Sequence, residues 1–201
     1  MTEDETRPGR PRDPGRDAAI LAATLDLLGE VGYERVTVRA IAQRAGAGLA
    51  TLYRRWSTKE ELVIDAVLSF EDVPPVPDPG TAADPVGVLV ELVGGLVNVL
   101  QGPRRGLVPN LVGQLPDNPG LAEVLRSRVV LPRLDAVATQ LGRVPGSRPE
   151  LLDEAAELVP ASAFFQVMVL GRHLSAPDVR RIVDRAVALA TATAVAAPGA
   201  S

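Results

Sequence analysis

Six basic side chains and no acidic one lie between Arg35 and Lys59, although the chain as a whole carries a formal net charge of -4. Positive charge gathered in one segment of an acidic protein indicates an anionic partner, such as the phosphate backbone of DNA. A run of cations is also typical of an ordinary solvated surface, so the charge alone does not select between these interpretations. The order of the residues around the cations is more informative.

The segment from Thr37 to Trp56 predicts a helix, a glycine turn and a second, short helix. Thr37 is a good N-cap for the first of these helices. Gly46 and Gly48 are expected to bracket a turn that is too tight for ordinary side chains, and the short helix is expected over about 49–56. This succession is the pattern of a helix-turn-helix, which places its second helix in the major groove of DNA.

The outward face of the short helix supplies the candidate base contacts. Side chains on that face would meet base edges in the major groove, whereas Leu52, Tyr53 and Trp56 can pack on the preceding helices. An arginine early in the first motif helix is long enough to reach a guanine in the same groove. The candidate base-reading residues are therefore Leu49, Ala50, Thr51, Arg54 and Arg39.

A second set of groups would bind phosphate and position the motif without reading sequence. We expect it to include the hydroxyl of Thr37 at a helix start, the phenol of Tyr53 and the ammonium of Lys59. Thr37 and Tyr53 also have structural alternatives, since threonine commonly caps helices and tyrosine commonly packs in a core. Arg44 and Arg55 would add long-range attraction that salt screens.

Residues 1–13 are expected to form a disordered basic arm. The arm contains Arg7, Arg10 and Arg12 within an Arg-Pro-Gly-Arg-Pro-Arg sequence that resembles an AT-hook. Such an arm could lie in a narrow A·T-rich minor groove. The same composition is common in disordered tails, so both interpretations stay open.

The elements that must position these residues are predicted to be helices. A helix over about 15–31 ends at Gly32, after which Tyr33 should fold back onto the core. The sequence Ser57-Thr-Lys-Glu60 is expected to be the capping box of a linking helix that continues to Phe70.

Four prolines between residues 71 and 80 mark a domain boundary, because no helix tolerates that density. Pro132 and Pro160 are expected to kink or interrupt later helices. The predicted fold is all-α, with a three-helix helix-turn-helix head, a linking fourth helix and a C-terminal helical ligand-binding and dimerisation bundle. Its parts are a head over 14–74 with the motif at about 37–56, a C-terminal domain over 84–194 and a tail over 195–201. The C-terminal helices are expected at about 85–101, 104–115, 119–141, 148–170 and 177–193.

The last two helices carry apolar stripes that could pack against a second copy of the chain or wholly inside one subunit. A dimer suits DNA reading, because one short helix contacts few base pairs. The dimer-interface candidates are Leu151, Leu152, Ala155, Leu158, Val179, Ile182, Val183 and Ala186. A ligand pocket among the preceding helices would be lined by residues that could equally be ordinary core: Leu92, Leu96, Leu100, Leu111, Phe164, Phe165 and Met168.

The composition argues against several other classes of protein. The chain of 201 residues has no cysteine and a single histidine, which excludes disulfides and thiolate zinc sites and leaves little for acid–base catalysis. No apolar run approaches the ~18 residues of a membrane span, and the first fifteen residues do not resemble a signal peptide. We therefore expect a cytoplasmic protein that is not an enzyme, with no metal, no cofactor and no membrane contact.

From Val36 to Glu60 the sequence resembles the DNA-binding head of the TetR family of bacterial transcriptional regulators, and the resemblance extends over about 14–70. It rests on the threonine at the start of the first motif helix, the Ala-Gly turn, a Thr-Leu-Tyr sequence, the aromatic residue that closes the short helix and the lysine that opens the next. Gly48 stands where the family commonly has a serine cap. The resemblance implies that the DNA contacts are Arg39, Thr51, Tyr53 and Lys59, with Leu49 and Ala50 in base-reading positions.

The resemblance also implies a helical effector-binding domain beyond residue 85 and a dimer interface on the last two long helices. The predicted function is that of a homodimeric repressor, which binds a palindromic operator in double-stranded DNA and responds to an unknown small-molecule effector. The sequence does not distinguish a repressor from an activator or from a ligand-independent regulator. Alternatives of another class are an enzyme built on a helical bundle and an interaction module whose helix-turn-helix contacts protein.

Overall fold

The computed structural model describes residues 14–69, 84–103 and 105–192, and every regular element in these ranges is a helix. This confirms the all-α fold. The chain divides into two compact units, Met1–Ala66 and Val67–Ser201. The basic arm with Arg7, Arg10 and Arg12, the proline-rich segment and the tail lie outside the described residues.

The N-terminal unit is built from α1 (Pro14–Arg35), α2 (Val38–Arg44), α3 (Leu49–Tyr53) and most of α4 (Lys59–Leu68). Gly32 interrupts α1 with φ 75° and ψ 165°, which confirms the predicted helix end there. Tyr33 follows with only 2% of its surface exposed, so it does fold back onto the core. The buried side chains of this unit come from all four helices and from the turn after α3, and they include Ile20, Leu28, Ile41, Leu52, Trp56, Leu62 and Ile64.

Helix α3 is shorter than predicted, because it ends at Tyr53 rather than at Trp56. Beyond it the backbone amides of Arg55 and Trp56 both donate to the carbonyl of Leu52, at 2.9 Å each, so the chain tightens into a turn. The indole Nε1 of Trp56 donates to Oδ2 of Asp65 in α4 at 2.8 Å. Trp56 is therefore drawn toward α4 instead of extending α3.

The packing of α3 also corrects one expectation about its side chains. A helix of five residues has no stability of its own, so it depends on tertiary packing. Leu52 is 1% exposed and supplies that packing; burying such a side chain contributes about 1.5–3 kcal/mol. Tyr53 was expected to pack beside it, but its side chain is 56% exposed, because the next residue along a helix points about 100° away.

The cap of α4 lies one residue later than predicted. Oγ1 of Thr58 accepts from the amide of Glu61 at 3.2 Å, and the Glu61 carboxylate accepts from the amide of Ser57 at 2.8 Å. Thr58 therefore takes the role expected of Ser57, and Glu61 that expected of Glu60. This shift leaves the carboxylate of Glu60 available for a different partner.

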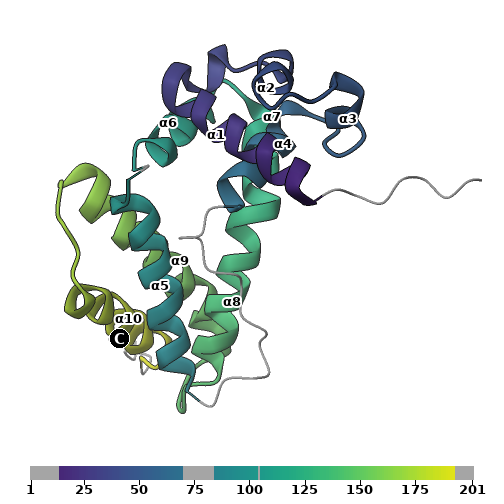
Figure 1. Cartoon of the computed structure of the whole chain (residues 1–201). Coiled ribbons are helices and arrows are strands. Elements are labelled where there is room, and N and C mark those ends of the chain that lie inside the picture. Colours follow the sequence, from purple (N-terminus) through teal and green to yellow (C-terminus); the bar gives the residue numbers. More distant parts are fainter. Residues whose placement is uncertain (1–13, 70–83, 104, 193–201) are drawn as a thin grey trace, which may run out of the picture. The chain divides into compact units, whose positions relative to one another are not determined.

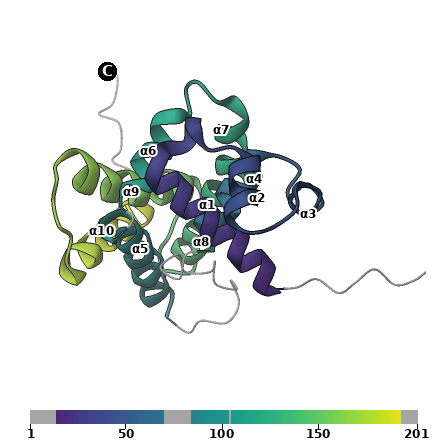
Figure 2. The ribbon, with the colours of Figure 1, turned by 45° about the horizontal axis from the view of Figure 1, so that its top comes forward.

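The C-terminal unit contains a longer series of helices, whose order is shown in Figure 1. They are α5 (Pro85–Gln101), α6 (Leu107–Gln114), α7 (Pro119–Leu125), η1 (Arg126–Val130), α8 (Leu131–Gly142), η2 (Pro149–Leu151), α9 (Leu152–Phe164), η3 (Phe165–Val169) and α10 (Ala176–Ala190). In Figures 1 and 2, helices α5, α8, α9 and α10 lie side by side, and they pack against one another. Their shared core is aliphatic and includes Leu89, Val97, Leu100, Leu141, Val159, Ile182 and Val183.

Two of the predicted C-terminal helices are divided by π-helical turns. The helix expected over 119–141 widens into η1, which ends two residues before Pro132. The helix expected over 148–170 widens into η3, which begins five residues after Pro160. Proline lacks the backbone donor that an α-helix requires, and a π turn is one way of accommodating a disturbed hydrogen-bond ladder. The two prolines thus accompany interruptions of their helices.

Candidate nucleic-acid interface

The helix-turn-helix begins at Thr37, which caps α2. Its Oγ1 accepts a 3.1 Å hydrogen bond from the amide of Ala40, and its backbone is extended. The side chain is exposed, and the capping bond uses the hydroxyl only as an acceptor. The hydroxyl proton therefore remains able to donate to a phosphate oxygen.

The turn between α2 and α3 requires glycine at one position and not at the other. Gly46 has φ 60°, and the amides of Gly46 and Ala47 donate to the carbonyls of Gln43 and Ala42, so α2 ends in a Schellman motif. Gly48 has φ -75° and ψ 143°, an extended conformation that any residue adopts. The expectation that both glycines are needed for tightness was therefore wrong for Gly48, where an added Cβ would meet only Oγ1 of Thr51 at 3.9 Å.

The two motif helices separate apolar from polar side chains as a groove-binding element requires. Ile41, Ala42 and Leu52 are buried against the rest of the unit. The opposite side presents residues to solvent, among them most of the predicted base readers, with Thr51 half-buried between them. The exposed candidates are Arg39, Leu49, Ala50, Tyr53 and Arg54.

The six cations of this segment are not equally available. Arg44 forms a 2.6 Å ion pair with Glu30 of α1, and Arg55 forms an ion pair with Asp17 of the same helix. A hydrogen bond from Arg44 lowers the pKa of Glu30, and the same bond raises the pKa of Arg44. Sequence reasoning missed these pairs because both acids lie outside the basic segment. Arg39, by contrast, is exposed and has no partner among the described residues.

The predicted phosphate contact Lys59 is engaged inside the unit. Its Nζ donates to the carbonyl oxygen of Tyr33 at 2.8 Å and lies 3.9 Å from the centroid of the Tyr33 ring. Partial burial lowers the pKa of Lys59. One of the three ammonium protons is used by the carbonyl, so the others remain able to donate.

Comparison with known proteins follows this geometry. Residues 20–66 match a family described as "Bacterial regulatory proteins, tetR family", and residues 76–186 match "Tetracyclin repressor-like, C-terminal domain". The HTH-type transcriptional regulator YdeS of Bacillus subtilis is 34% identical over 187 residues, which cover 90% of this chain and 93% of YdeS. The chain belongs to the TetR family.

A further relative agrees with the TetR-family assignment, and a solved structure shares the fold. The DNA-binding transcriptional repressor TetR of Mycobacteroides abscessus is 29% identical over 183 residues, covering 86% of this chain and 92% of that protein. The crystal structure of the multidrug binding protein EbrR complexed with imidazole is 20% identical and covers 92% of this chain and 97% of EbrR. Its TM-score of 0.57 shows that the fold is shared. The chain is thus a DNA-binding transcriptional regulator and not an enzyme.

In this TetR-family regulator, most of the dimer-interface candidates lie in the core of a single subunit. Ala155, Val179, Ile182, Val183 and Ala186 are buried there, and Leu151 and Leu152 are half-buried. We call the exposed large apolar side chains of α9, η3 and the residue after η3 the α9 strip. Its members are Leu158, which is one of the interface candidates, Phe165, Val169 and Leu170. The exposed residues in the middle of α10 are instead largely charged and include Arg180, Arg181, Asp184 and Arg185.

The pocket candidates are dispersed. Leu100 and Leu111 are buried, and Leu92, Leu96, Phe164 and Met168 are half-buried against the core. Only Phe165, which is 52% exposed, lines the cavity of about 590 Å³ that lies beside η3 and α10. The other lining residues come from α9, η3, the turn that follows and α10. Ile182 among them was expected at the dimer interface, and the polar ones belong to no apolar stripe that sequence reasoning could follow.

Two further features of the regulator concern membrane insertion and metal binding. Within residues 14–69, 84–103 and 105–192, no helix combines the length and the apolar character that crossing a membrane requires. In the same ranges, no three histidine, cysteine, aspartate or glutamate side chains gather in a way that could hold a metal ion.

Proposed function

We propose that this TetR-family regulator is a ligand-responsive repressor that binds a palindromic operator as a dimer. The observation that carries the proposal is the exposed face of α2 and α3, on which Arg39, Leu49 and Tyr53 lie opposite the buried Ile41 and Leu52. The relative from Mycobacteroides abscessus is named as a repressor, which supports the repressing role.

In the proposed complex α3 enters the major groove. The methyl groups of Ala50 and Thr51 and the side chain of Leu49 contact thymine methyls, and the guanidinium of Arg39 donates to O6 and N7 of a guanine. Arg54 lies beside Thr51, with its Nη2 3.4 Å from Oγ1, and reaches base edges or the adjacent backbone.

Phosphate contacts then fix the orientation of the head. The hydroxyl of Thr37 and the phenol of Tyr53 donate to phosphate oxygens from exposed positions. Lys59 donates to a phosphate oxygen through the ammonium protons that are not hydrogen-bonded to the carbonyl of Tyr33. Gly48 adds no side chain at the start of α3, so the backbone approaches the DNA closely.

Dimerisation would supply the second head, which reads the second half-site of the operator. Two heads related by a two-fold axis read half-sites about one helical turn apart, and this is the geometry of a palindrome. The α9 strip is the surface we assign to the contact between subunits, because it exposes large apolar side chains that a monomer would leave in water.

Ligand response requires two arrangements of the dimer with different affinities for the effector. A molecule that binds more tightly to the arrangement with wrongly spaced heads shifts the population away from DNA. The multidrug binding protein EbrR, which shares the fold, was solved with imidazole, and this supports a ligand site in the present chain.

The test is a fluorescence-anisotropy titration of labelled palindromes taken from the region upstream of the regulator's own gene. Arg39→Ala and Thr51→Ala should each weaken operator binding about tenfold or more, because each removes a base contact. Arg44→Ala is the matched control: it removes an arginine from the same helix, but one that is ion-paired with Glu30. It should change affinity by less than about threefold.

Two results would contradict this proposal. Equal losses in the Arg39 and Arg44 variants would mean that charge rather than the exposed face determines binding. Several phosphate contacts make DNA binding steeply salt-dependent. An affinity for the labelled palindrome that does not fall with added salt would therefore contradict the proposed phosphate contacts and favour a motif that contacts protein. Transcription in vitro from a bound promoter distinguishes the repressor, which lowers transcript, from an activator, which raises it.

A further inference from the structure

The cavity beside η3 and α10 carries positive charge, and we call it the basic groove. It has a volume of about 590 Å³, and the turn that joins η3 to α10 forms one of its walls. Its titratable side chains are Arg172, His173, Asp178, Arg181 and Arg185. Three arginines against one aspartate give it a charge of +2 with the histidine neutral, in a chain whose formal net charge is -4.

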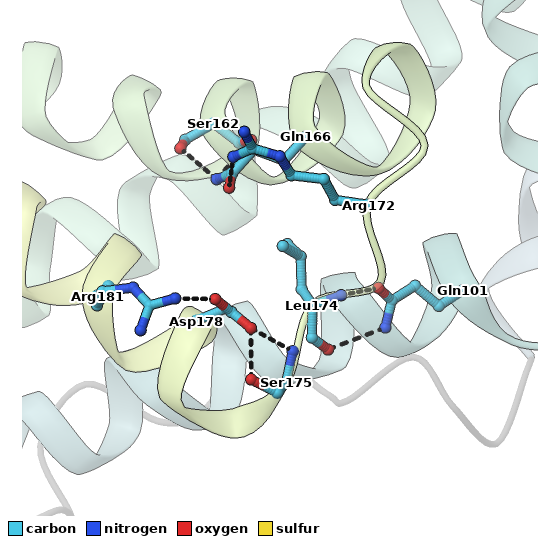
Figure 3. A network of polar contacts seen from close by, with 8 residues as sticks. All are labelled: Gln101, Ser162, Gln166, Arg172, Leu174, Ser175, Asp178 and Arg181. Atoms are coloured by element: carbon cyan, nitrogen blue, oxygen red, sulfur yellow. Dashed lines mark hydrogen bonds and ion pairs between the residues drawn. The ribbon is translucent and has the colours of Figure 1, made fainter.

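The one carboxylate of the basic groove is already engaged within its own subunit. Asp178 accepts a 2.8 Å hydrogen bond from the amide of Ser175 and another from the Ser175 hydroxyl, and it forms an ion pair with Arg181 (Figure 3). Arg185 has no partner among the described residues. The groove therefore presents positive charge that its own subunit does not balance.

The wall formed by the turn is held in place by two glutamines, as Figure 3 shows. Oε1 of Gln166 accepts from the guanidinium of Arg172 at 3.3 Å, and the amide of Arg172 donates to the carbonyl of Gln166 at 2.9 Å. Gln101 of α5 donates to the carbonyl of Leu174 at 3.2 Å and accepts from the Leu174 amide. Arg172 is thus positioned before a partner arrives, which reduces the entropy that binding costs.

The basic groove is continuous with the α9 strip. Phe165 belongs to both, and Leu170, the last member of the strip, lies two residues before Arg172. The surface that we assign to dimerisation therefore does not end at its apolar side chains, and the groove meets whatever part of a second subunit lies beyond the partner's strip.

The opposite end of the strip is acidic. Asp153, Glu154 and Glu157 lie in the first two turns of α9, and all three are exposed and have no partner among the described residues. Glu154, Leu158 and Phe165 are spaced by four and seven residues, so they lie on one face of the helix. Along this face the side chains are acidic, then apolar, and the basic groove follows.

A two-fold dimer brings the same surface of both subunits together, and it can do so in two orientations. If the axis runs along α9, the two helices are parallel, and acidic end faces acidic end. If the axis crosses the middle of the strip, the helices are antiparallel, and Leu158 lies beside the partner subunit's Leu170. Both orientations bury the strip, so the charges decide between them, because like charges facing each other across an interface oppose association.

We propose that the subunits pair with their α9 helices antiparallel, and that the basic groove of each subunit receives the acidic first turns of the other subunit's α9. Glu157, one residue before the strip, meets the partner subunit's Arg172, and Glu154 lies one turn further into the groove, toward the partner subunit's Arg185. The two-fold axis forms each of these contacts twice. The inference rests on the proposed dimer, to which it adds the orientation of the subunits and the charges that fix it.

A charge exchange tests the pairing in the full chain. Glu157→Arg and Arg172→Glu should each raise the dimer dissociation constant about tenfold or more, because each places like charges together at two symmetric sites. The variant that carries both substitutions restores opposite charges and should dimerise within about threefold of the parent. Glu91→Arg is the control, since Glu91 is exposed on α5, outside the groove and the strip. It should change the constant less than about twofold, as sedimentation velocity measures.

Cross-linking tests the orientation, and the absence of cysteine from the chain makes it clean. Glu157→Cys and Arg172→Cys are made separately and together and are treated with a short bis-maleimide. Within one subunit the two positions lie about 20 Å apart along the helix, beyond the reach of the linker. The double variant should therefore give a covalent dimer on a denaturing gel, whereas neither single variant should.

Three results would overturn the inference. The exchanged variant could dimerise no better than the single variants, the double cysteine variant could fail to cross-link although sedimentation shows a dimer, or Glu157→Cys alone could cross-link, as parallel helices require. The first two leave the proposed dimer standing and reject only its charge pairing or its orientation. A parent chain that stays monomeric at every concentration would reject the proposed dimer as well.

Discussion

Tyr33 donates a 2.8 Å hydrogen bond from its phenolic oxygen to Oε1 of Glu60, joining the end of α1 to the first turn of α4. Lys59, the neighbour of Glu60, binds the carbonyl and the ring face of the same tyrosine. One buried aromatic residue therefore holds two charged side chains of opposite sign. These contacts join α1 to α4, the two helices that precede and follow α2 and α3 in the chain.

Tyr33→Phe should destabilise the regulator by about 1–2 kcal/mol, because it removes one of the hydrogen-bond donors of a partly buried carboxylate. The chain offers a matched control in its second tyrosine. Tyr53 is largely exposed, so Tyr53→Phe should leave the free energy of unfolding unchanged. Urea denaturation followed by circular dichroism measures the free energy of unfolding of both variants. Equal stability of the two would show that the Tyr33–Glu60 hydrogen bond does not stabilise the unit.

Glu60 should contribute to loss of stability in acid. Burial raises the pKa of its carboxyl, but hydrogen bonds from backbone, Tyr33 and Thr58 outweigh burial, and the net pKa lies below the ordinary 4.5. A carboxyl whose pKa is lowered by folding stabilises the protein above its unfolded pKa, and this contribution disappears as the pH falls through the folded value. Below pH 4.5, the parent should lose unfolding free energy more steeply than Glu60→Gln; parallel pH profiles would contradict this.

The two glycines of the turn should respond oppositely to the same substitution. Gly46→Ser places a side chain at φ 60° and should cost about 1–2 kcal/mol. Gly48→Ser keeps an extended backbone and adds a capping hydroxyl to α3, which should stabilise by a few tenths of a kcal/mol. Thermal unfolding of the pair tests the turn, and comparable losses at both positions would show that Gly48 is constrained as well.

A charge placed in the α9 strip should weaken the dimer. Phe165→Glu and Leu158→Glu would each bury a carboxylate between subunits and should raise the dimer dissociation constant at least about tenfold. Leu131→Glu is the control, because Leu131 lies outside the strip and is as exposed as Phe165. Sedimentation velocity over a concentration series gives the constants, and a Leu131 variant that dissociated as readily would remove the strip from the interface.

The helix pattern of the fold was predictable, and its interruptions were not. The apolar spacing and the glycine at position 32 located α1, and Pro85 and Gln101 bound α5 as expected. The π turns η1 and η3 lie inside stretches whose apolar periodicity is continuous. Their widening depends on how each helix packs around its proline, which a local pattern does not contain.

The exposed motif face followed from residue types, but its electrostatics did not. Leu52 and Trp56 fix which side of the motif is buried, so the positions of Leu49 and Ala50 follow from helical geometry. The pairing of Arg55 with Asp17 depends instead on how α1 passes α3. The cavity beside η3 and α10 was missed for the same reason, because residues such as His173 and Arg185 line it only once the fold brings the turn and the helices together.

The ion pairs between the basic segment and α1 bear on how the regulator searches the chromosome. Arg44 and Arg55 form ion pairs with Glu30 and Asp17, and the chain outside the basic segment carries a net negative charge. We therefore expect bulk genomic DNA to attract the free protein less strongly at long range than six unpaired cations would, and residence on random sequence to be shorter. Selectivity would then come more from fit at the target than from prolonged sliding.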